Sequence, residues 1–254
     1  MAVCLTAQTG TPLAAWTPGT LDVHQISTGL GNAALFILPD GTTLLVDADA
    51  VAGSGEVEAH PDGSRGPGEW IARYIRRHLP AGVTGLDYAL ITHFHGDHMG
   101  QVTPSSPMDR TGTYRLSGIT DVAEALPIQT LLDRGFPDYS YPTPLTDEST
   151  ANYRRFVEAR RARGMTVERF HPESRAQITL RHEPAKHPAF EIRNDAHRDR
   201  SARDASGGSD GPHRHPRRAG RRAVSGICSG QSGRARPRSS GVGAVPGSWR
   251  QSVS

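Results

Sequence analysis

The sequence has few cysteines, no long apolar run and no convincing leader, and the first two shortages each exclude a class of protein. Only 2 cysteines, Cys4 and Cys228, occur in 254 residues, so neither a disulfide framework nor a cysteine zinc finger can form. No apolar stretch approaches the roughly 20 residues of a membrane helix. The start MAVCLTAQTGTPLAAW lacks a basic n-region and a full apolar h-region. We therefore expect no membrane span, and both a cytoplasmic location and export by a truncated signal peptide stay open.

The C-terminal part of the chain has no lysine or glutamate and few apolar residues. Residues 196–254 contain 12 arginines against 3 aspartates, a balance of +9, whereas residues 1–195 have a balance of −6. Such a segment buries too little apolar surface to offset the loss of chain entropy on folding. We therefore expect an unstructured lead-in or signal remnant over 1–17, a folded domain over 18–195, and a disordered tail rich in Arg, Ser, Gly and Pro over 196–254.

Within the folded part, the apolar pattern predicts strands that alternate with helices. The predicted strands are 21–26, 33–38, 42–46, 86–92, 165–170, 176–181 and 189–193, and the predicted helices are 69–79, 119–126 and 148–163. Asp40-Gly41 predicts a tight hairpin, and Asp47 is expected to end the third strand. This pattern predicts an α/β domain with its chemistry at the carboxyl end of a strand.

Four potential metal ligands follow the strand 86–92 directly: His93, His95, Asp97 and His98. Residues i and i+2 of an extended segment point the same way, so His93 and His95 can face one ion, and the next turn directs Asp97 and His98 toward a second. Imidazole and carboxylate ligands suit Zn²⁺, with iron or manganese as alternatives. The competing interpretation is a set of surface histidines near a helix start, capped by Asp97 or Thr92.

The His93-x-His95-x-Asp97-His98 pattern, after a strand and after an earlier strand ending in Asp47, resembles the metallo-β-lactamase superfamily of metal-dependent hydrolases. Within it, the segment 29–47 is similar to members related to the hydrolase domain of bacterial DNA-uptake (competence) proteins. The resemblance implies an αββα sandwich and two zinc ions, the first held by His93 and His95 and the second by Asp97 and His98. It also implies that Asp97 orients a bridging water and that Asp47 supports the ligand loop, although a local turn explains Asp47 equally well.

What the resemblance implies for activity is hydrolysis of an ester, phosphodiester or amide by metal-bound hydroxide, on a small-molecule or phosphodiester substrate. The family also uses a third histidine, a bridging carboxylate and a last histidine, all further along the chain. Among the later histidines, His182 and His187 flank prolines in a loop and are interpreted as surface residues. The abrupt change of composition near 194–196 suggests a frameshift, so we expect an incomplete sandwich and an incomplete ligand set that leaves the chain inactive or nearly so.

Two further hypotheses concern binding. The basic tail, with its arginine cluster Arg217, Arg218, Arg221 and Arg222, favours an alternative function as a nucleic-acid-associated protein whose metal cluster is structural. The segment 136–142 gathers aromatic residues and prolines in a loop, which is typical either of a substrate entrance or of a packed surface loop.

Overall fold

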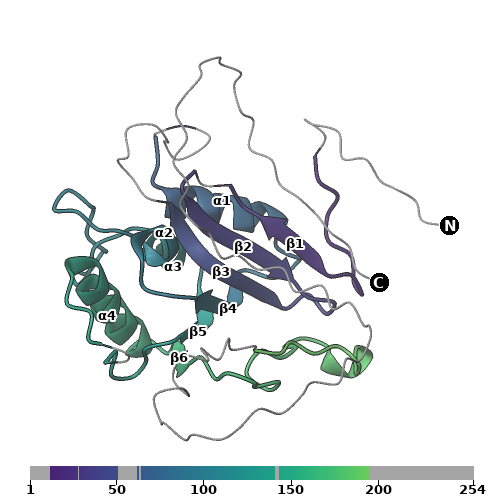
Figure 1. Cartoon of the computed structure of the whole chain (residues 1–254). Coiled ribbons are helices and arrows are strands. Elements are labelled where there is room, and N and C mark those ends of the chain that lie inside the picture. The colour runs from purple at the N-terminus through teal and green to yellow at the C-terminus, as the bar shows by residue number, and fades with distance from the viewer. Residues whose placement is uncertain (1–11, 28, 51–61, 63, 141–142, 195–254) are drawn as a thin grey trace, which may run out of the picture. The chain divides into compact units, whose positions relative to one another are not determined.

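Six strands form one sheet and follow each other across it in chain order (Figure 1). This computed structural model describes residues 12–27, 29–50, 62, 64–140 and 143–194. The expected tail 196–254 and most of the expected lead-in lie outside the described residues. The strands are β1 Asp22–Gln25, β2 Gly31–Ile37, β3 Thr43–Ala50, β4 Leu86–Ile91, β5 Ile128–Asp133 and β6 Thr166–Arg169.

The predicted hairpin at Asp40-Gly41 joins β2 to β3. Gly41 has a φ of 89°, and the Leu38 N–H donates to the Thr42 carbonyl at 2.8 Å. The Asp40 carboxylate accepts the Thr42 N–H at 2.9 Å. Glycine adopts this left-handed backbone without the clash that a Cβ would cause, so the turn is encoded locally.

Beyond this hairpin the sheet becomes parallel. Strands β1, β2 and β3 pair antiparallel, whereas β3, β4, β5 and β6 pair parallel. Parallel neighbours place their carboxyl ends at the same edge of the sheet. The loops after β4 and β5 therefore start side by side.

The helices cover one face of the sheet because their apolar residues are spaced to form one stripe. They are α1 Pro67–His78, the single turn α2 Gly96–Met99, α3 Ile119–Ala125 and α4 Glu148–Arg161. One continuous core joins Ile71 and Ile75 of α1, Phe156 of α4, and Leu45 and Leu131 of the sheet.

A smaller apolar cluster lies on the other face, where Leu44, Tyr88 and Leu132 contact Ile178 and, less deeply, Ile192. The segment that supplies these two isoleucines is irregular apart from a short 3₁₀ helix, Pro184–Lys186. The predicted strands 176–181 and 189–193 are therefore wrong. Their apolar residues pack onto the sheet, but their backbones join no strand ladder.

The predicted α/β class is confirmed, as one mixed six-stranded sheet with helices on one face, an arrangement consistent with part of an αββα sandwich. No helix within the described ranges is both long and apolar enough to cross a membrane. The expected strand end at Asp47 is wrong: β3 continues to Ala50 because it stays paired with β2 after it has separated from β4.

Candidate functional site

The histidine motif lies where β4 ends between its two parallel neighbours. Pairing of β3 with β4 stops at Val46 and Leu90, and pairing of β4 with β5 stops at Ile91 and Asp133. The chain then leaves the sheet and turns at once into α2. This brings the four predicted ligands to the carboxyl edge of the sheet.

Three imidazoles gather at this edge. The Nε2 atom of His93 lies 3.1 Å from Nδ1 of His95, and the rings of His93 and His98 are 3.8 Å apart between centroids. The Asp97 carboxylate contacts His98 from the other side, with 3.4 Å between Oδ2 and Nε2. The structure thus brings together all four residues that the motif singled out.

Asp47 joins this cluster from β3. It has a φ of 55°, a left-handed backbone that costs a non-glycine residue roughly 1–2 kcal/mol. This backbone conformation directs its carboxylate at the end of β4. There Oδ1 accepts the Thr92 N–H at 2.9 Å and Oδ2 accepts the Thr92 hydroxyl at 2.8 Å. Oδ2 also lies 2.7 Å from Nδ1 of His98. Asp47 therefore fixes both the start of the motif and the ring of its last histidine.

Three other residues at this edge were not assigned to the site from the sequence, where Thr92 was considered only as a helix cap. Asn32 of β2 approaches Nε2 of His98 at 3.4 Å. The buried carboxylate of Asp49 accepts the Gln101 N–H at 3.1 Å, which holds the chain just after α2. The hydroxyl of Thr92 bridges Asp47 and His93. Asp49 could have been found from its position two residues after Asp47. The contacts of Asn32 and Thr92 depend on the strand register.

The electrostatics of the cluster favour the neutral form of His93. Burial lowers the pKa of His93, and the neighbouring His98 and His95 lower it further, against the opposite effect of Asp47 and Asp97. A neutral imidazole is the form that binds a metal ion.

The donor chemistry suits a metal, but the donors face one another in pairs. Within the described part of the chain, no three His, Cys, Asp or Glu side chains converge as a group able to hold an ion. His93 and His95 are directed at each other, and His98 is directed at Asp47. A bound ion would require the first two rings to turn about their side-chain torsions.

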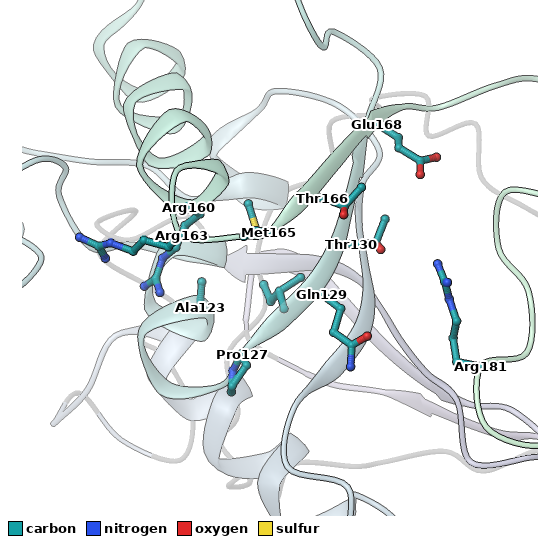
Figure 2. Close-up of a pocket in the computed structure, with 12 residues that line it drawn as sticks. Ala123, Pro127, Gln129, Thr130, Arg160, Arg163, Met165, Thr166, Glu168 and Arg181 are labelled. Atoms are coloured by element: carbon teal, nitrogen blue, oxygen red, sulfur yellow. The ribbon is translucent and has the colours of Figure 1, made fainter.

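A separate pocket of about 640 Å³ lies at the opposite, amino ends of β5 and β6. Figure 2 shows Thr130 and Thr166 in its wall with Arg163 and Arg181 at its rim. Both arginines are engaged, the first with the Thr111 hydroxyl and the second with the Tyr88 hydroxyl. The pocket therefore lies at the opposite ends of the strands from the histidine motif. Both of these arginines are already hydrogen-bonded to other residues of the protein.

Comparisons with known proteins show little similarity in sequence or structure. No family model matches the sequence, and no curated protein matches it. Among solved structures, the chain is similar to the CmlA beta-hydroxylase E377D mutant, at a TM-score of 0.31 and 15% sequence identity. The similarity covers 60% of this chain and 30% of that one, so the chain spans less than a third of the length of that enzyme.

Proposed function

We propose that this chain binds divalent metal through His93, His95, Asp97 and His98 and acts as a metal-dependent hydrolase. The observation that carries the proposal is the gathering of three imidazoles and a carboxylate at one strand end, next to an aspartate whose strained backbone turns it toward them. Left-handed backbone at a non-glycine residue is often found at functional sites. A set of capping or surface histidines explains neither the grouping nor the strain.

The chain's own residues have separable tasks in this proposal. Asp47 holds Nδ1 of His98, so Nε2 stays directed toward Asp97 and Asn32. A hydrogen-bonded carboxylate behind a metal-binding imidazole fixes its tautomer and orientation. When bound, zinc, iron or manganese supplies hydroxide near neutral pH and polarises an ester, phosphodiester or amide oxygen.

The ligand set that we propose is incomplete compared with the superfamily that the motif resembles, which implies two ions. His182 and His187 do not join the cluster: His182 is exposed and lies 3.1 Å from Asp87. We therefore expect weak metal binding and slow turnover of bis(p-nitrophenyl) phosphate or p-nitrophenyl acetate. Metal analysis after dialysis checks this, and retention of two ions per chain would contradict it.

The ligand assignment is tested with a matched pair of histidine variants. His95→Ala removes a proposed ligand, whereas His187→Ala removes a histidine of the irregular segment. We expect His95→Ala to weaken zinc binding at least about tenfold in a competition titration, because one ligand is lost. His187→Ala should leave it unchanged, and equal losses would refute the assignment.

The alternative proposal is a nucleic-acid-associated protein, supported by the +9 balance of residues 196–254. Its test is deletion of that tail. Loss of nucleic-acid binding with an unchanged metal content favours this function, whereas unchanged nucleic-acid binding refutes it. A salt-dependent affinity alone does not decide, because any strongly basic segment shows one.

A further inference from the structure

Arg134 lies at the same edge of the sheet as the histidine motif. Ile91 of β4 is the register partner of Asp133 of β5, so Thr92 and Arg134 are the first residues beyond the paired ends of the two strands. The guanidinium of Arg134 lies over the ring of Phe94, 5.5 Å from its centroid. Phe94 itself stands between the first two histidines of the motif.

Nothing in the described part of the chain neutralises this cation. No carboxylate there lies within 4.0 Å of the Arg134 guanidinium. Its Nε atom is buried and has no hydrogen-bond partner among the described residues. Buried polar groups are nearly always hydrogen-bonded, so the unpaired Nε–H of Arg134 is a donor that a bound anion can satisfy.

The support beneath Arg134 is rigid. The ring of Phe94 packs on Tyr139 at 5.6 Å and on Tyr153 at 5.5 Å between centroids. A Cβ added at Gly135 would come within 2.8 Å of Phe94, so the glycine lets the loop after β5 lie directly against this ring. Stacking on a fixed ring removes much of the freedom of an arginine side chain before any ligand arrives.

Two further arginines extend the positive charge over the same loop. Arg154 lies 5.5 Å from the ring centroid of Tyr139, and Arg161 lies 4.9 Å from that of Phe136. Neither has a carboxylate partner within the described residues. The loop's own acid, Asp138, is bound to the Ser140 N–H at 3.2 Å. Three arginines therefore lie over this loop, while the acidic side chains Asp47 and Asp97 lie at the histidine motif itself.

We propose that Arg134 binds a phosphate or carboxylate group of the substrate, which makes the substrate an anion. This inference rests on the proposed function, since it assigns the substrate class of the same site. A planar guanidinium offers two parallel N–H donors to an oxyanion. Bound at Arg134, such a group positions the rest of the substrate toward His93 and His95. Arg154 and Arg161 attract the anion to this edge.

The test measures binding to the metal-free, full-length protein, so it does not depend on hydrolysis. Phenyl phosphate and benzoate are titrated by calorimetry, with benzyl alcohol as the neutral probe. We expect saturable binding of at least one anion and at least about tenfold weaker binding of the alcohol, because a charge-assisted hydrogen bond is lost. The stronger of the two anions identifies the group as phosphate or carboxylate.

The matched variants are Arg134→Gln and Arg155→Gln. Arg155 belongs to α4 and is paired with Glu148, so its loss should change the affinity less than twofold, whereas Arg134→Gln should weaken it about tenfold. Equal effects, or no saturable binding, would overturn the inference. The tail is present in every variant, so its charge cancels in the comparison.

A measurement on the unmodified chain covers the case in which Arg134→Gln fails to fold. The Nε–Hε signal of Arg134 in an NMR spectrum should shift on addition of the anion, while that of Arg155 should not, and an unshifted Arg134 signal would overturn the inference. If zinc binding is absent but the anion still binds at Arg134, the proposed function fails and the anion site stands. If zinc binds but the anion does not bind at Arg134, the proposed function stands and only the anion site is refuted.

Discussion

The Asp47 carboxylate lies 2.7 Å from Nδ1 of His98, across 51 positions of sequence. The contact exists because β3 and β4 are parallel neighbours whose pairing stops at Val46 and Leu90, just before Asp47 and before the segment that carries His98. The same carboxylate holds the backbone N–H of Thr92. One side chain of β3 therefore contacts both the start and the last histidine of the histidine motif.

Asp47→Asn should weaken zinc binding about tenfold, because a neutral amide holds the His98 ring less firmly than a carboxylate. It should also lower the free energy of unfolding by about 1–3 kcal/mol, since Asp47 is buried and its hydrogen bonds are charge-assisted. A zinc competition titration and urea denaturation measure the two effects. The control is Asp62→Asn at an exposed aspartate. Unchanged values for Asp47→Asn would show that the contact has no energetic role.

Asp121 should make the stability of the protein depend on pH. Burial raises its pKa to about 7, helped by the charges of Glu69 and Glu124 and opposed by the Gly118 N–H. A carboxyl group whose pKa is higher in the folded state favours folding when protonated, so its contribution is lost as pH rises from about 4 to about 7. Asp121→Asn should therefore be increasingly more stable than the parent chain across that range, with no further gain above it.

Urea denaturation of both proteins at pH 4, 6 and 8 measures this difference. Asp138→Asn is the control, because Asp138 is exposed. A difference between Asp121→Asn and the parent that stays constant over the three pH values would contradict the prediction.

Gly68 should be the most sensitive position in the contact between α1 and α3. A Cβ there would lie 2.3 Å from the Gly118 carbonyl oxygen and 2.7 Å from Cβ of Asp121. Gly68→Ala should lower the free energy of unfolding by about 1–3 kcal/mol, because backbone must shift to relieve the overlap. Gly66→Ala is the control, since a Cβ added there would lie at an ordinary 3.5 Å from its nearest neighbour, Oδ2 of Asp121. Thermal denaturation compares the two, and an equal loss in both would argue against close packing as the cause.

Local patterns predicted much of the fold. The hairpin at Gly41, the helix that became α1 and the strand that became β4 each depend on spacing or turn chemistry within a few residues. The predicted strand 165–170 is confirmed in its centre as β6. The sequence within each of these elements is enough to predict it, so no knowledge of its distant partners was needed.

The errors and omissions depend on partners far along the chain. β5 was missed because its short apolar run is a strand only between β4 and β6. Residues 176–181 and 189–193 were misread as strands because Ile178 and Ile192 pack on the sheet, and packing leaves the same apolar pattern as pairing.

The candidate site divides in the same way. The motif itself was visible in the sequence, and the structure brings its four residues together. The contact of Asp47 with His98 and the stacking of Arg134 on Phe94 were not foreseeable in detail. Both follow from strand register and side-chain orientation, which a single sequence does not state.

The irregular segment over the second face of the sheet is fastened by side chains and not by a ladder. Asp40 accepts the backbone N–H groups of His182 and Glu183, and Thr42 accepts that of Arg181. Burial alone would raise the pKa of Asp40, but the N–H groups that it accepts outweigh burial and lower it. Acid therefore loosens the fastening, since protonation removes the acceptor that these bonds need. We expect this segment to open as a separate unit while the sheet stays folded. Amide hydrogen exchange should then be faster over residues 176–183 than in β4, on which the segment packs.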